Sequence, residues 1–389
     1  MRRNLKRKKR TKNIAIIVNS LSTGGAEKVA AMLSVHLFEQ GKNVYLMLDD
    51  YDRKKSYQHR GKIVRMFHPN TGNPWLDLLY KSKDLKNKKE LYKIDCSISF
   101  IEDNNFVNVL SSIGELIIVS VHTYLTDRMN EWSKDAFRYR VLIPLLYNWA
   151  DHVIALTNAG KEDLHRNFYI SKRKISIIQN AVDKDSLNAK KDIELSENAI
   201  LMIGRLEEVK AYWYAILAMK KVLVKNESIH LYILGKGKLL KKLQQLACEC
   251  GIEKNIHFLG FHSNVGDYLR CAKLFLLTSI VEGFSNVVIE ALSSNTAVLC
   301  TDCVGPREIL NPKQKDKKKI ENTVYGEFGI LVPCIAKPQE REIEILASAI
   351  LNLIKNDSLR EYYEHIAEKR AKDFEQTLIY KKWDKLINI

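Results

Sequence analysis

The pattern that most constrains the fold is an alternation of short apolar runs with amphipathic helical stretches, which occurs twice along the chain. Such an alternation is typical of parallel β-sheets covered by helices. Strands are expected at 13–20, 43–48, 62–67, 95–100, 116–121, 152–157 and 175–179, and then at 199–203, 229–234, 256–259, 273–277, 297–301 and 329–332. The sequence therefore predicts an α/β protein with two Rossmann-like domains facing across a cleft, where ligands bind at the carboxyl ends of the strands.

Length and polarity divide the chain into segments. Its 389 residues leave room for two domains with separate cores. Residues 184–198 are polar and lack periodicity, which indicates a linker between the two series. We therefore expect a basic flexible arm at 1–12, an N-terminal domain at 13–183, a C-terminal domain at 199–372, and a final helix at 373–389 that packs back on the N-terminal domain.

Positive charge is concentrated in two places. The net charge is +16, and residues 1–12 alone contain eight lysines and arginines. Such an arm suits anionic lipid or nucleic acid on charge alone, and a solvated tail without a partner is an equal alternative. A second stretch combines Trp75 with Lys81, Lys83 and Lys86. This pattern fits either a segment lying in a membrane interface or an ordinary surface helix with a basic face.

Several classes of protein are disfavoured by missing patterns. No segment reaches the ~18 apolar residues that a membrane-spanning helix needs. Gly235-Lys236-Gly237 lacks the third glycine at a helix start, which argues against a nicotinamide dehydrogenase. Cys300 and Cys303 lack a second pair at zinc spacing, so we interpret them as reduced core thiols, which favours a cytoplasmic location.

A candidate site follows the apolar run 274–277, where a short turn carries Glu282 and a helix carries Glu290 eight residues later. Backbone N–H groups and the helix dipole favour anions at such a helix start. Gly283 permits close backbone approach, and Asn286 lies near the helix start. Two carboxylates beside an anion site suit a ligand with both phosphates and hydroxyls, although a salt bridge to Lys or Arg is the alternative for either glutamate.

Three other strand ends carry candidate residues. Gly24-Gly25 lies between a strand and a helix, where glycine lets the backbone approach a ligand or simply makes a tight turn. Gly204-Arg205 and Lys210 follow the first strand of the second series, and two cations there can neutralise a diphosphate or lie solvated at the surface. His122 ends another strand, where it can bind a sugar hydroxyl or serve a structural role.

These motifs, in this order and together with 178–183, resemble the retaining family 4 glycosyltransferases of the GT-B fold from about residue 13 onward. Glu282-x7-Glu290 matches the paired-glutamate motif of that family. The likeness extends to the N-acetylgalactosaminyltransferases of bacterial lipid-linked oligosaccharide assembly in protein N-glycosylation. The family usually has Gly or Asn after the lysine, whereas Ala211-Tyr212-Trp213 follows here and either shapes the acceptor side or packs the next helix.

The resemblance implies a domain that binds the acceptor, followed by a domain that binds the nucleotide sugar, and it implies roles for the candidate residues. Glu282 and His122 would contact the donor sugar, and Glu290 would bind the ribose. The expected diphosphate ligands are Arg205 and Lys210 beside Gly204. The sugar hydroxyls or the phosphate would be bound by backbone amides around Gly283, Phe284, Ser285 and Asn286. Finally, Gly24 and Gly25 would border the phosphate and the acceptor.

The leading hypothesis is a retaining, metal-independent enzyme that moves a hexosamine, with GalNAc favoured, from a UDP-sugar to a polyprenyl-diphosphate-linked saccharide. It would need no cofactor and would associate peripherally with the anionic inner face of the cytoplasmic membrane. Alternatives are a lipopolysaccharide or capsule enzyme using another UDP-hexose, a UDP-sugar epimerase or hydrolase, and a nucleic-acid-binding protein. We expect no nucleic-acid partner, because no RNA-binding module accompanies the arm.

Overall fold

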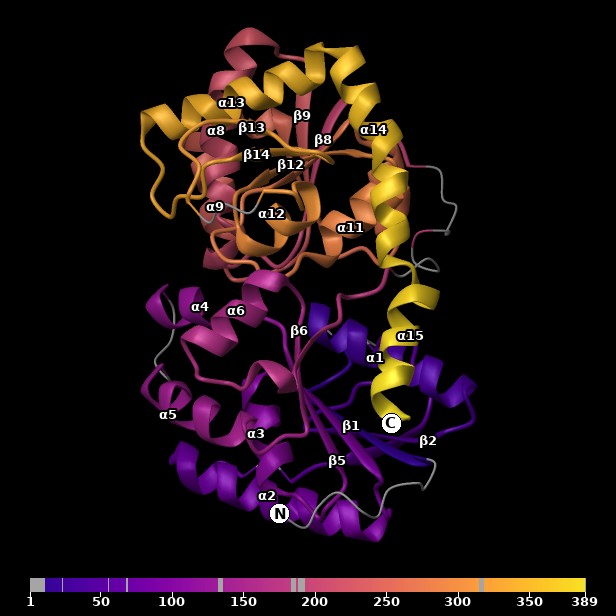
Figure 1. The fold of residues 1–389 in the computed structure, drawn as a ribbon. Helices are drawn as coiled ribbons and strands as arrows, with labels where there is room; N and C mark the ends of the chain where they lie inside the picture. The colour runs from indigo at the N-terminus through magenta and orange to yellow at the C-terminus, as the bar shows by residue number, and fades with distance from the viewer. Residues whose placement is uncertain are drawn as a thin grey trace. The chain divides into compact units, whose positions relative to one another are not determined.

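The computed structural model describes residues 11–22, 24–54, 56–67, 69–131, 136–182, 187, 193–314 and 318–388 (Figure 1). The chain forms two compact units, here called unit 1 (Met1–Ala181 with Thr377–Ile389) and unit 2 (Val182–Gln376). Residues 1–10 of the predicted arm and most of the predicted linker at 184–198 lie outside the described residues.

Unit 1 is built on a seven-stranded sheet in the order β3-β2-β1-β4-β5-β6-β7, and each neighbouring pair is parallel. Sequence periodicity located all of these strands to within two residues at either end. The strands are β1 (Asn13–Val18), β2 (Asn43–Leu48), β3 (Lys62–Arg65), β4 (Cys96–Phe100), β5 (Leu116–Val121), β6 (His152–Ala155) and β7 (Ile175–Ile177).

Helices cover both faces of this sheet, because successive side chains of a strand point to opposite sides. Ile14 and Ile16 of β1 pack with α1 (Gly25–Glu39) and α15 (Gln376–Ile387). Ala15 and Ile17 pack in a second core with the other helices of the unit. These are α2 (Pro74–Leu91), α3 (Glu102–Leu110), α4 (Leu125–Glu131), α5 (Ala136–Tyr147) and α6 (Asn158–Arg166), and a 3-10 turn, η1 (Lys172–Lys174), precedes β7.

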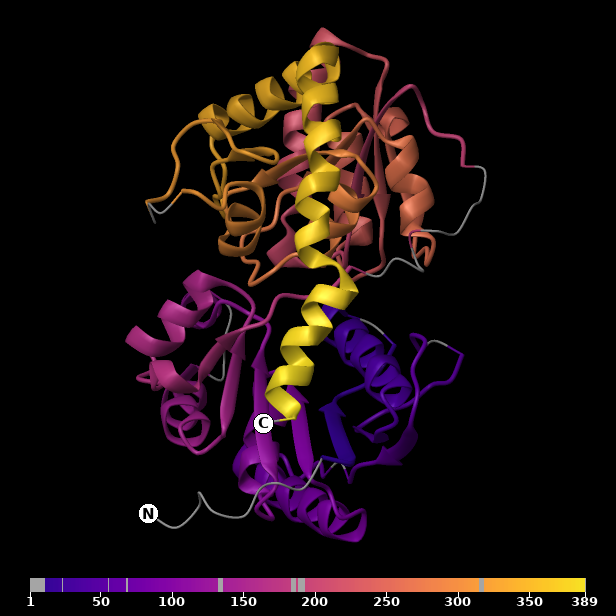
Figure 2. The same cartoon turned by 45° about the vertical axis from the view of Figure 1, so that its right-hand side comes forward.

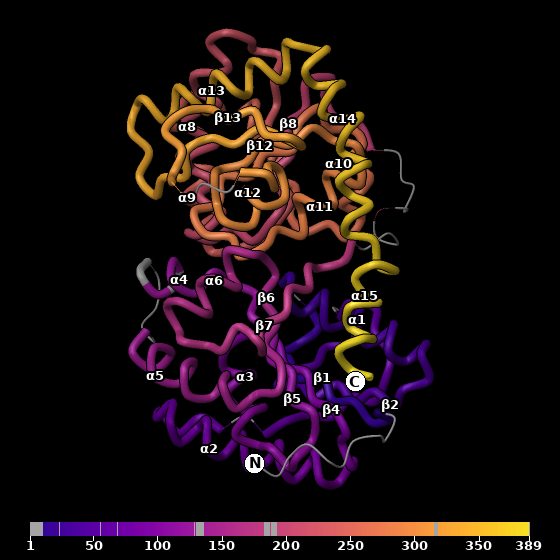
Figure 3. Tube along the Cα trace, in the orientation of Figure 1, coloured from indigo at the N-terminus to yellow at the C-terminus, as the bar shows by residue number. Residues whose placement is uncertain are grey.

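Helix α15 returns the end of the chain to unit 1, where it lies beside α1 (Figures 2 and 3). Trp383 is 3% exposed in the core that contains β1 and β4. The Asp384 carboxylate lies 2.9 Å from the His36 ring nitrogen of α1, and Lys382 donates to the Gln179 side chain at 2.7 Å. The final helix therefore completes the hydrophobic core of the N-terminal unit.

A buried ion pair stabilises the other face of unit 1. The Lys89 amine of α2 lies 2.6 Å from a Glu115 carboxylate oxygen, and both side chains are fully buried. Lys89 also donates to the Asn108 side chain of α3 at 2.7 Å. Burial lowers the pKa of Lys89 to about 8, although the neighbouring Glu115 acts in the opposite direction.

Unit 2 contains a second seven-stranded sheet in the order β10-β9-β8-β11-β12-β14-β13. The six predicted strands are confirmed, and the sequence missed the antiparallel β13 because two residues carry no periodicity. The strands are β8 (Asn198–Ile203), β9 (Ile229–Leu234), β10 (Ile256–Gly260), β11 (Leu274–Leu277), β12 (Ala297–Thr301), β13 (Val324–Tyr325) and β14 (Ile330–Val332).

The core of unit 2 joins Ile200 and Met202 of β8 to three helices, α8 (Tyr212–Lys225), α9 (Leu240–Glu249) and α13 (Glu340–Lys355). Helix α14 (Asp357–Ala371) packs along α11 (Asn286–Ser293). The other elements are α10 (Val265–Cys271), α12 (Val304–Leu310) and three 3-10 turns, η2 (Glu208–Lys210), η3 (Glu253–Asn255) and η4 (Lys372–Phe374).

All seven cysteines are free thiols. Cys300 is buried in β12, whereas the Cys303 sulfur lies 3.5 Å from that of Cys334 after β14. Both Cys303 and Cys334 contact the Ser279 carbonyl oxygen. The thiols are thus part of the packing beneath the segment that follows β11.

Candidate functional site

In unit 2 the segments that follow β8 and β11 are held against each other. The two strands are neighbours in the sheet and parallel, so their carboxyl ends meet at one edge. The Ile280 amide donates to the Val209 carbonyl at 2.8 Å, and the Thr278 hydroxyl donates to the Lys210 and Ala211 carbonyls at 3.0 Å each. Two motifs that lie about seventy residues apart in the sequence therefore form one surface.

Lys210 and Glu282 form an ion pair across this surface. Their side chains are 20% and 12% exposed, so the pair is shielded yet reachable from solvent. The Ser279 hydroxyl donates to the same carboxylate oxygen of Glu282 at 3.0 Å. The carboxylate thus fixes the position of the ammonium group, and the salt bridge considered from the sequence is part of the candidate site.

Arg205 lies at the same strand end but is far less constrained. Its side chain is 63% exposed, and its only ion pair within the described residues joins Nη1 to a Glu207 carboxylate oxygen at 3.2 Å. An exposed pair of this kind stabilises by less than about 1 kcal/mol, so the guanidinium can exchange it for a stronger anion.

Glycine is required where the loop after β8 meets the loop after β9. Gly204 has a φ of 153°, and a Cβ atom at Gly235 would lie 1.8 Å from the Gly204 carbonyl oxygen. Any side chain at Gly235 would force the loops apart. Gly235 is therefore needed for the packing of the two loops beside Arg205. This role explains why Gly235-Lys236-Gly237 occurs here without the third glycine of a dinucleotide-binding motif.

Helix α11 begins beside the Glu282 turn. Ser285 is its N-cap residue and makes no side-chain hydrogen bond to the helix, a feature that suits anion binding at the first turn. A Cβ atom at Gly305 would lie 2.7 Å from the Phe284 Cα, so α12 and the 283–286 segment are closely packed. Glu290 lies one helical turn after Asn286 and is 5% exposed.

Unit 1 carries Gly24 and Gly25 at the start of α1. Gly24 has a φ of 114°, and a Cβ atom there would lie 2.2 Å from a Glu27 carboxylate oxygen. Gly24 is the N-cap residue and has no side chain to cap the helix. The positive φ therefore favours glycine at this position, whereas the flexible Glu27 side chain could move to make room for a Cβ atom.

His122 directly follows β5 and is partly buried. Its Nε2 atom lies 3.0 Å from the Ser120 hydroxyl, and its ring centre lies 5.3 Å from that of Phe100. Burial lowers the pKa of His122 to about 4, so the imidazole is neutral at physiological pH. A neutral imidazole at a strand end offers a hydrogen bond without adding charge.

Sequence reasoning missed Glu102, which follows β4 and is 0% exposed. Its carboxylate accepts a hydrogen bond from the Thr123 hydroxyl, next to His122, at 3.2 Å. The sequence pattern could have identified Glu102, because an acidic residue soon after an apolar strand is also the pattern by which Glu282 was selected. Glu102 therefore joins the polar groups at the carboxyl edge of the first sheet.

The basic stretch 75–89 forms most of α2, but its lysines do not share one face. Trp75 is 44% exposed, and Lys83 and Lys86 are exposed. The structure corrects the expectation for Lys81, which is 9% exposed and lies 2.6 Å from an Asp49 carboxylate oxygen. Helical spacing places Lys81 on the inner side of α2, one turn after Leu78.

The described residues contain no cluster of three or more His, Cys, Asp or Glu side chains arranged to hold a metal ion. Within the same residues, no helix combines the length and apolarity needed to cross a lipid bilayer.

Comparison with known proteins shows the family. Residues 23–186 match the model of Glycosyltransferase Family 4, and residues 183–370 match that of Glycosyl transferases group 1. An uncharacterized glycosyltransferase of Methanocaldococcus jannaschii is 31% identical over 84% of this chain and 87% of its own length. The chain therefore belongs to the glycosyltransferases of this family.

A Campylobacter jejuni relative is 29% identical over 94% of this chain and 96% of its own length. It is named N-acetylgalactosamine-N,N'-diacetylbacillosaminyl-diphospho-undecaprenol 4-alpha-N-acetylgalactosaminyltransferase. The structure of Anabaena HepE in complex with UDP and glucose has a TM-score of 0.77 and 18% identity, covering 96% of this chain and 98% of HepE. WaaG, a glycosyltransferase involved in lipopolysaccharide biosynthesis, has a TM-score of 0.73. The fold is GT-B, as the sequence predicted.

Proposed function

We propose that this glycosyltransferase moves a hexosamine, with GalNAc favoured, from a UDP-sugar to a polyprenyl-diphosphate-linked saccharide, with retention of configuration and without a metal ion. The observation that carries the proposal is the Lys210–Glu282 ion pair beside Arg205 and the start of α11. This arrangement combines positive charge for a diphosphate with a carboxylate for sugar hydroxyls. The names of two Campylobacter relatives support the choice of sugar and acceptor, since both specify GalNAc transfer to a lipid-diphosphate saccharide.

In this proposal the donor lies along the carboxyl edge of the second sheet. Arg205 and Lys210 bind the diphosphate, Glu282 binds the donor sugar, and Glu290 accepts hydrogen bonds from the ribose. Backbone amides at 283–286 add donors at the start of α11. The exposed Arg205 exchanges its bond to Glu207 for the diphosphate, which carries two negative charges and can accept two hydrogen bonds from the guanidinium.

The proposed chemistry needs little from the protein beyond charge placement. The bond between the sugar C1 and the phosphate oxygen breaks, the acceptor oxygen attacks C1 from the same face, and the leaving phosphate oxygen takes the acceptor proton. Lys210 and Arg205 stabilise the negative charge that develops on the diphosphate. The neutral His122 offers a hydrogen bond to the donor sugar, and Gly24 and Gly25 border the phosphate and the acceptor.

A screen of UDP-GalNAc, UDP-GlcNAc, UDP-Glc and UDP-Gal against a polyprenyl-diphosphate-linked disaccharide, read by mass, tests the proposal. We expect the largest product yield with UDP-GalNAc, an α linkage by NMR, and unchanged activity in EDTA. A preference for UDP-Glc or UDP-Gal would favour the lipopolysaccharide or capsule alternative. Donor consumption without acceptor would favour a hydrolase or epimerase.

We also propose that unit 1 attaches the enzyme peripherally to the cytoplasmic face of an anionic membrane. Phe137, Val141 and Leu145 recur every four residues along α5 and are 76%, 44% and 49% exposed. Trp149, just after α5, is 59% exposed, and Tyr169, whose carbonyl accepts a hydrogen bond from Asn148 at 3.1 Å, is 78% exposed. An apolar stripe of this kind with exposed basic residues nearby, including Arg140 and Arg173, suits insertion into a lipid interface.

Flotation with phosphatidylglycerol-containing vesicles tests this attachment. We expect the full chain to bind at physiological salt, and Phe137→Ser with Trp149→Ser to reduce the bound fraction at least tenfold. Unchanged binding in that double variant would contradict a role for α5. Gel shift with single-stranded RNA tests the nucleic-acid alternative, for which we expect no binding beyond a weak, salt-sensitive effect of residues 1–12.

A further inference from the structure

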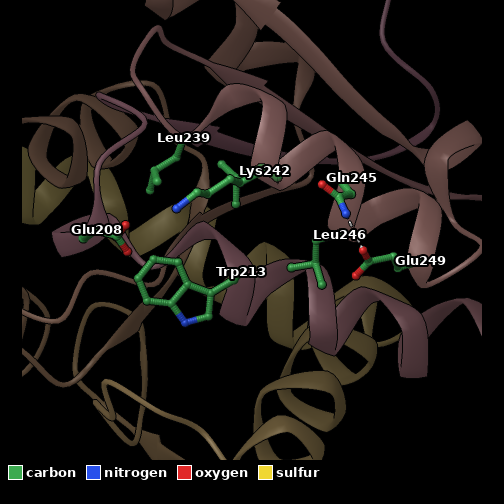
Figure 4. Close-up of a pocket in the computed structure, with 8 residues that line it drawn as sticks. Glu208, Trp213, Leu239, Lys242, Gln245, Leu246 and Glu249 are labelled. Atoms are coloured by element: carbon green, nitrogen blue, oxygen red, sulfur yellow. Dashed lines mark hydrogen bonds between the residues drawn. The ribbon is translucent and has the colours of Figure 1, made fainter.

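A pocket between α8 and α9 of unit 2 has no role in the site described above (Figure 4). Its volume is about 380 Å³, and it is open to solvent, since Lys242, Gln245 and Glu249 on its lining are exposed. Four of its lining residues are apolar and four are polar, so it differs from both a hydrophobic groove and a charged patch. The lining residues are Glu208, Trp213, Leu239, Lys242, Leu243, Gln245, Leu246 and Glu249.

Trp213 forms the aromatic side of the pocket. It is the second residue of α8, and it packs against the core of unit 2 while lining the pocket. Ala211, the N-cap residue of α8, has a left-handed φ of 45° and lies between the helix and η2, which ends at Lys210. An indole face attracts the weakly positive C–H groups of a pyranose ring, so a partly exposed tryptophan makes a platform for a sugar.

The polar residues lie around the same opening. Figure 4 shows the Lys242 amine and the Glu208 carboxylate extending toward the side of the pocket where Trp213 lies. Neither group has a hydrogen bond or an ion pair with another described residue. The Gln245 amide donates to the Glu249 carboxylate at 2.8 Å. Donors and acceptors of both kinds are therefore available to hydroxyl groups.

The net charge of the side chains that line the pocket limits which ligands can bind there. Two carboxylates, Glu208 and Glu249, face one ammonium, Lys242, so the pocket carries a net negative charge. Such a pocket disfavours phosphate, nucleotide and anionic lipid. A neutral ligand with an apolar face and a rim of hydroxyls satisfies both the indole and the polar groups. A hexose or N-acetylhexosamine unit has this chemistry.

The pocket is built on the same loop as the candidate donor site. Glu208 and Lys210 belong to the same 3-10 turn, η2. The Leu239 amide at the start of α9 donates to the Leu206 carbonyl, next to Arg205, at 3.2 Å. A saccharide chain whose one end reacts at this loop therefore has another of its sugars within reach of Trp213.

We infer that this pocket binds a neutral sugar unit of the acceptor or product chain, at a distance from the hydroxyl that reacts. This inference rests on the proposed transfer to a lipid-linked saccharide and adds a preference for acceptors with several sugars. Binding energy from the distant sugar lowers KM for long acceptors and leaves short acceptors unaffected.

Steady-state kinetics with two synthetic polyprenyl-diphosphate acceptors, one carrying a single N-acetylhexosamine and one carrying four, test the inference. We expect Trp213→Ala to raise KM for the tetrasaccharide acceptor about tenfold while kcat stays within about twofold. KM for the monosaccharide acceptor stays as in the wild type. Equal changes for both acceptors, or no change for either, would overturn the subsite.

Matched variants distinguish the loss of a sugar contact in the pocket from a general effect of the substitution on folding. Trp213→Phe keeps an aromatic face and restores most of the affinity. Gln245→Ala raises KM for the tetrasaccharide acceptor, whereas Gln244→Ala, at the neighbouring exposed position of α9 outside the pocket, leaves it unchanged. Similar results for Gln244→Ala and Gln245→Ala would argue against a specific pocket.

A binding measurement keeps this inference separate from the proposed function. Saturation-transfer NMR uses a free N-acetylhexosamine tetrasaccharide without donor, with wild-type protein and with Trp213→Ala. We expect transfer to the sugar protons with the wild type, loss of the signal in the variant, and no displacement by inorganic phosphate. Absence of binding to the wild type overturns the subsite, whereas the donor screen alone decides the transfer reaction.

Discussion

The two Rossmann-like units carry charged side chains close to their sheets but use them differently. In unit 1, Lys89 and Glu115 are fully buried against each other, and Lys81 and Asp49 are only 11% and 13% exposed in their ion pair. In unit 2, Lys210 and Glu282 keep 20% and 12% exposure, and Arg205 is 63% exposed. The comparison indicates that the Lys89–Glu115 pair maintains the fold of unit 1, whereas Lys210, Glu282 and Arg205 remain accessible to the ligand proposed for unit 2.

Exposed apolar side chains, in contrast, are more numerous on unit 1 than on unit 2. Of the 18 large hydrophobic side chains that are exposed in the described residues, 14 belong to unit 1 and four to unit 2. Those on α5, together with Trp149 and Tyr169, are the proposed membrane contacts. The difference agrees with the proposed partners, which are a lipid surface for unit 1 and a diphosphate for unit 2.

Removing the buried charge of unit 1 is expected to have the largest effect. Lys89→Met leaves the Glu115 carboxylate buried without its positively charged partner, with only the hydrogen bonds from Ser97 and Ile113 remaining, which costs about 3–5 kcal/mol of unfolding free energy. The double variant with Glu115→Leu recovers most of that loss. Urea unfolding checks both, with Lys88→Met as the control, because Lys88 lies in a more exposed pair with Asp84. Equal losses for Lys88→Met and Lys89→Met would contradict the structural role.

Removing a cation of unit 2 is expected to change activity rather than stability. Lys210→Ala and Arg205→Ala each lower turnover about 100- to 1,000-fold, because each removes a donor that stabilises the leaving diphosphate. Sugar transfer at saturating donor measures the effect. Asp50→Ala, at an exposed position of unit 1, is the control and leaves turnover nearly unchanged. Losses of the same size in all three variants would remove the distinction between the units.

His122 links the stability of unit 1 to pH. Its pKa is about 4 in the folded protein, below the ordinary 6.5, because burial disfavours the charged form. The stabilising contribution of the neutral imidazole is therefore complete above about pH 6.5 and is lost as the pH falls toward 4, by up to about 3 kcal/mol.

Urea unfolding between pH 7 and 4 measures this dependence. His122→Asn is expected to flatten the curve over that interval, whereas His365→Asn, at an exposed position of α14, serves as the control. A wild-type slope that persists in His122→Asn would assign the pH dependence to other groups.

The smallest expected effect concerns the exposed lysines of α2. Lys83→Ala with Lys86→Ala weakens vesicle binding by about 1 kcal/mol for each charge removed. Lys241→Ala with Lys254→Ala removes the same charge from exposed positions of unit 2. We expect the unit 2 variant to bind vesicles as the wild type does. Equal weakening in both variants would mean that net charge, rather than the surface of unit 1, governs attachment.

Periodicity predicted most of the fold, because each strand buries its apolar residues within one short run. It failed at β13, where two residues carry no pattern, and at Lys81, whose position on the inner face of α2 depends on Asp49 in the loop after β2. The motif residues Lys210 and Glu282 were identified, but their contact depends on the adjacency of β8 and β11. Trp213 stood out only as an unusual residue, because a pocket requires side chains from two helices.

The return of α15 to unit 1 also determines the order in which the two units can fold during synthesis on the ribosome. The core around β1 lacks Ile379 and Trp383 until the whole of unit 2 has been synthesised, although most of unit 1 emerges first. Unit 2 is continuous in sequence and can close as soon as it leaves the exit tunnel. The N-terminal unit is therefore the last to mature, and a ribosome that stalls before residue 377 would release a chain with an open hydrophobic face beside α1.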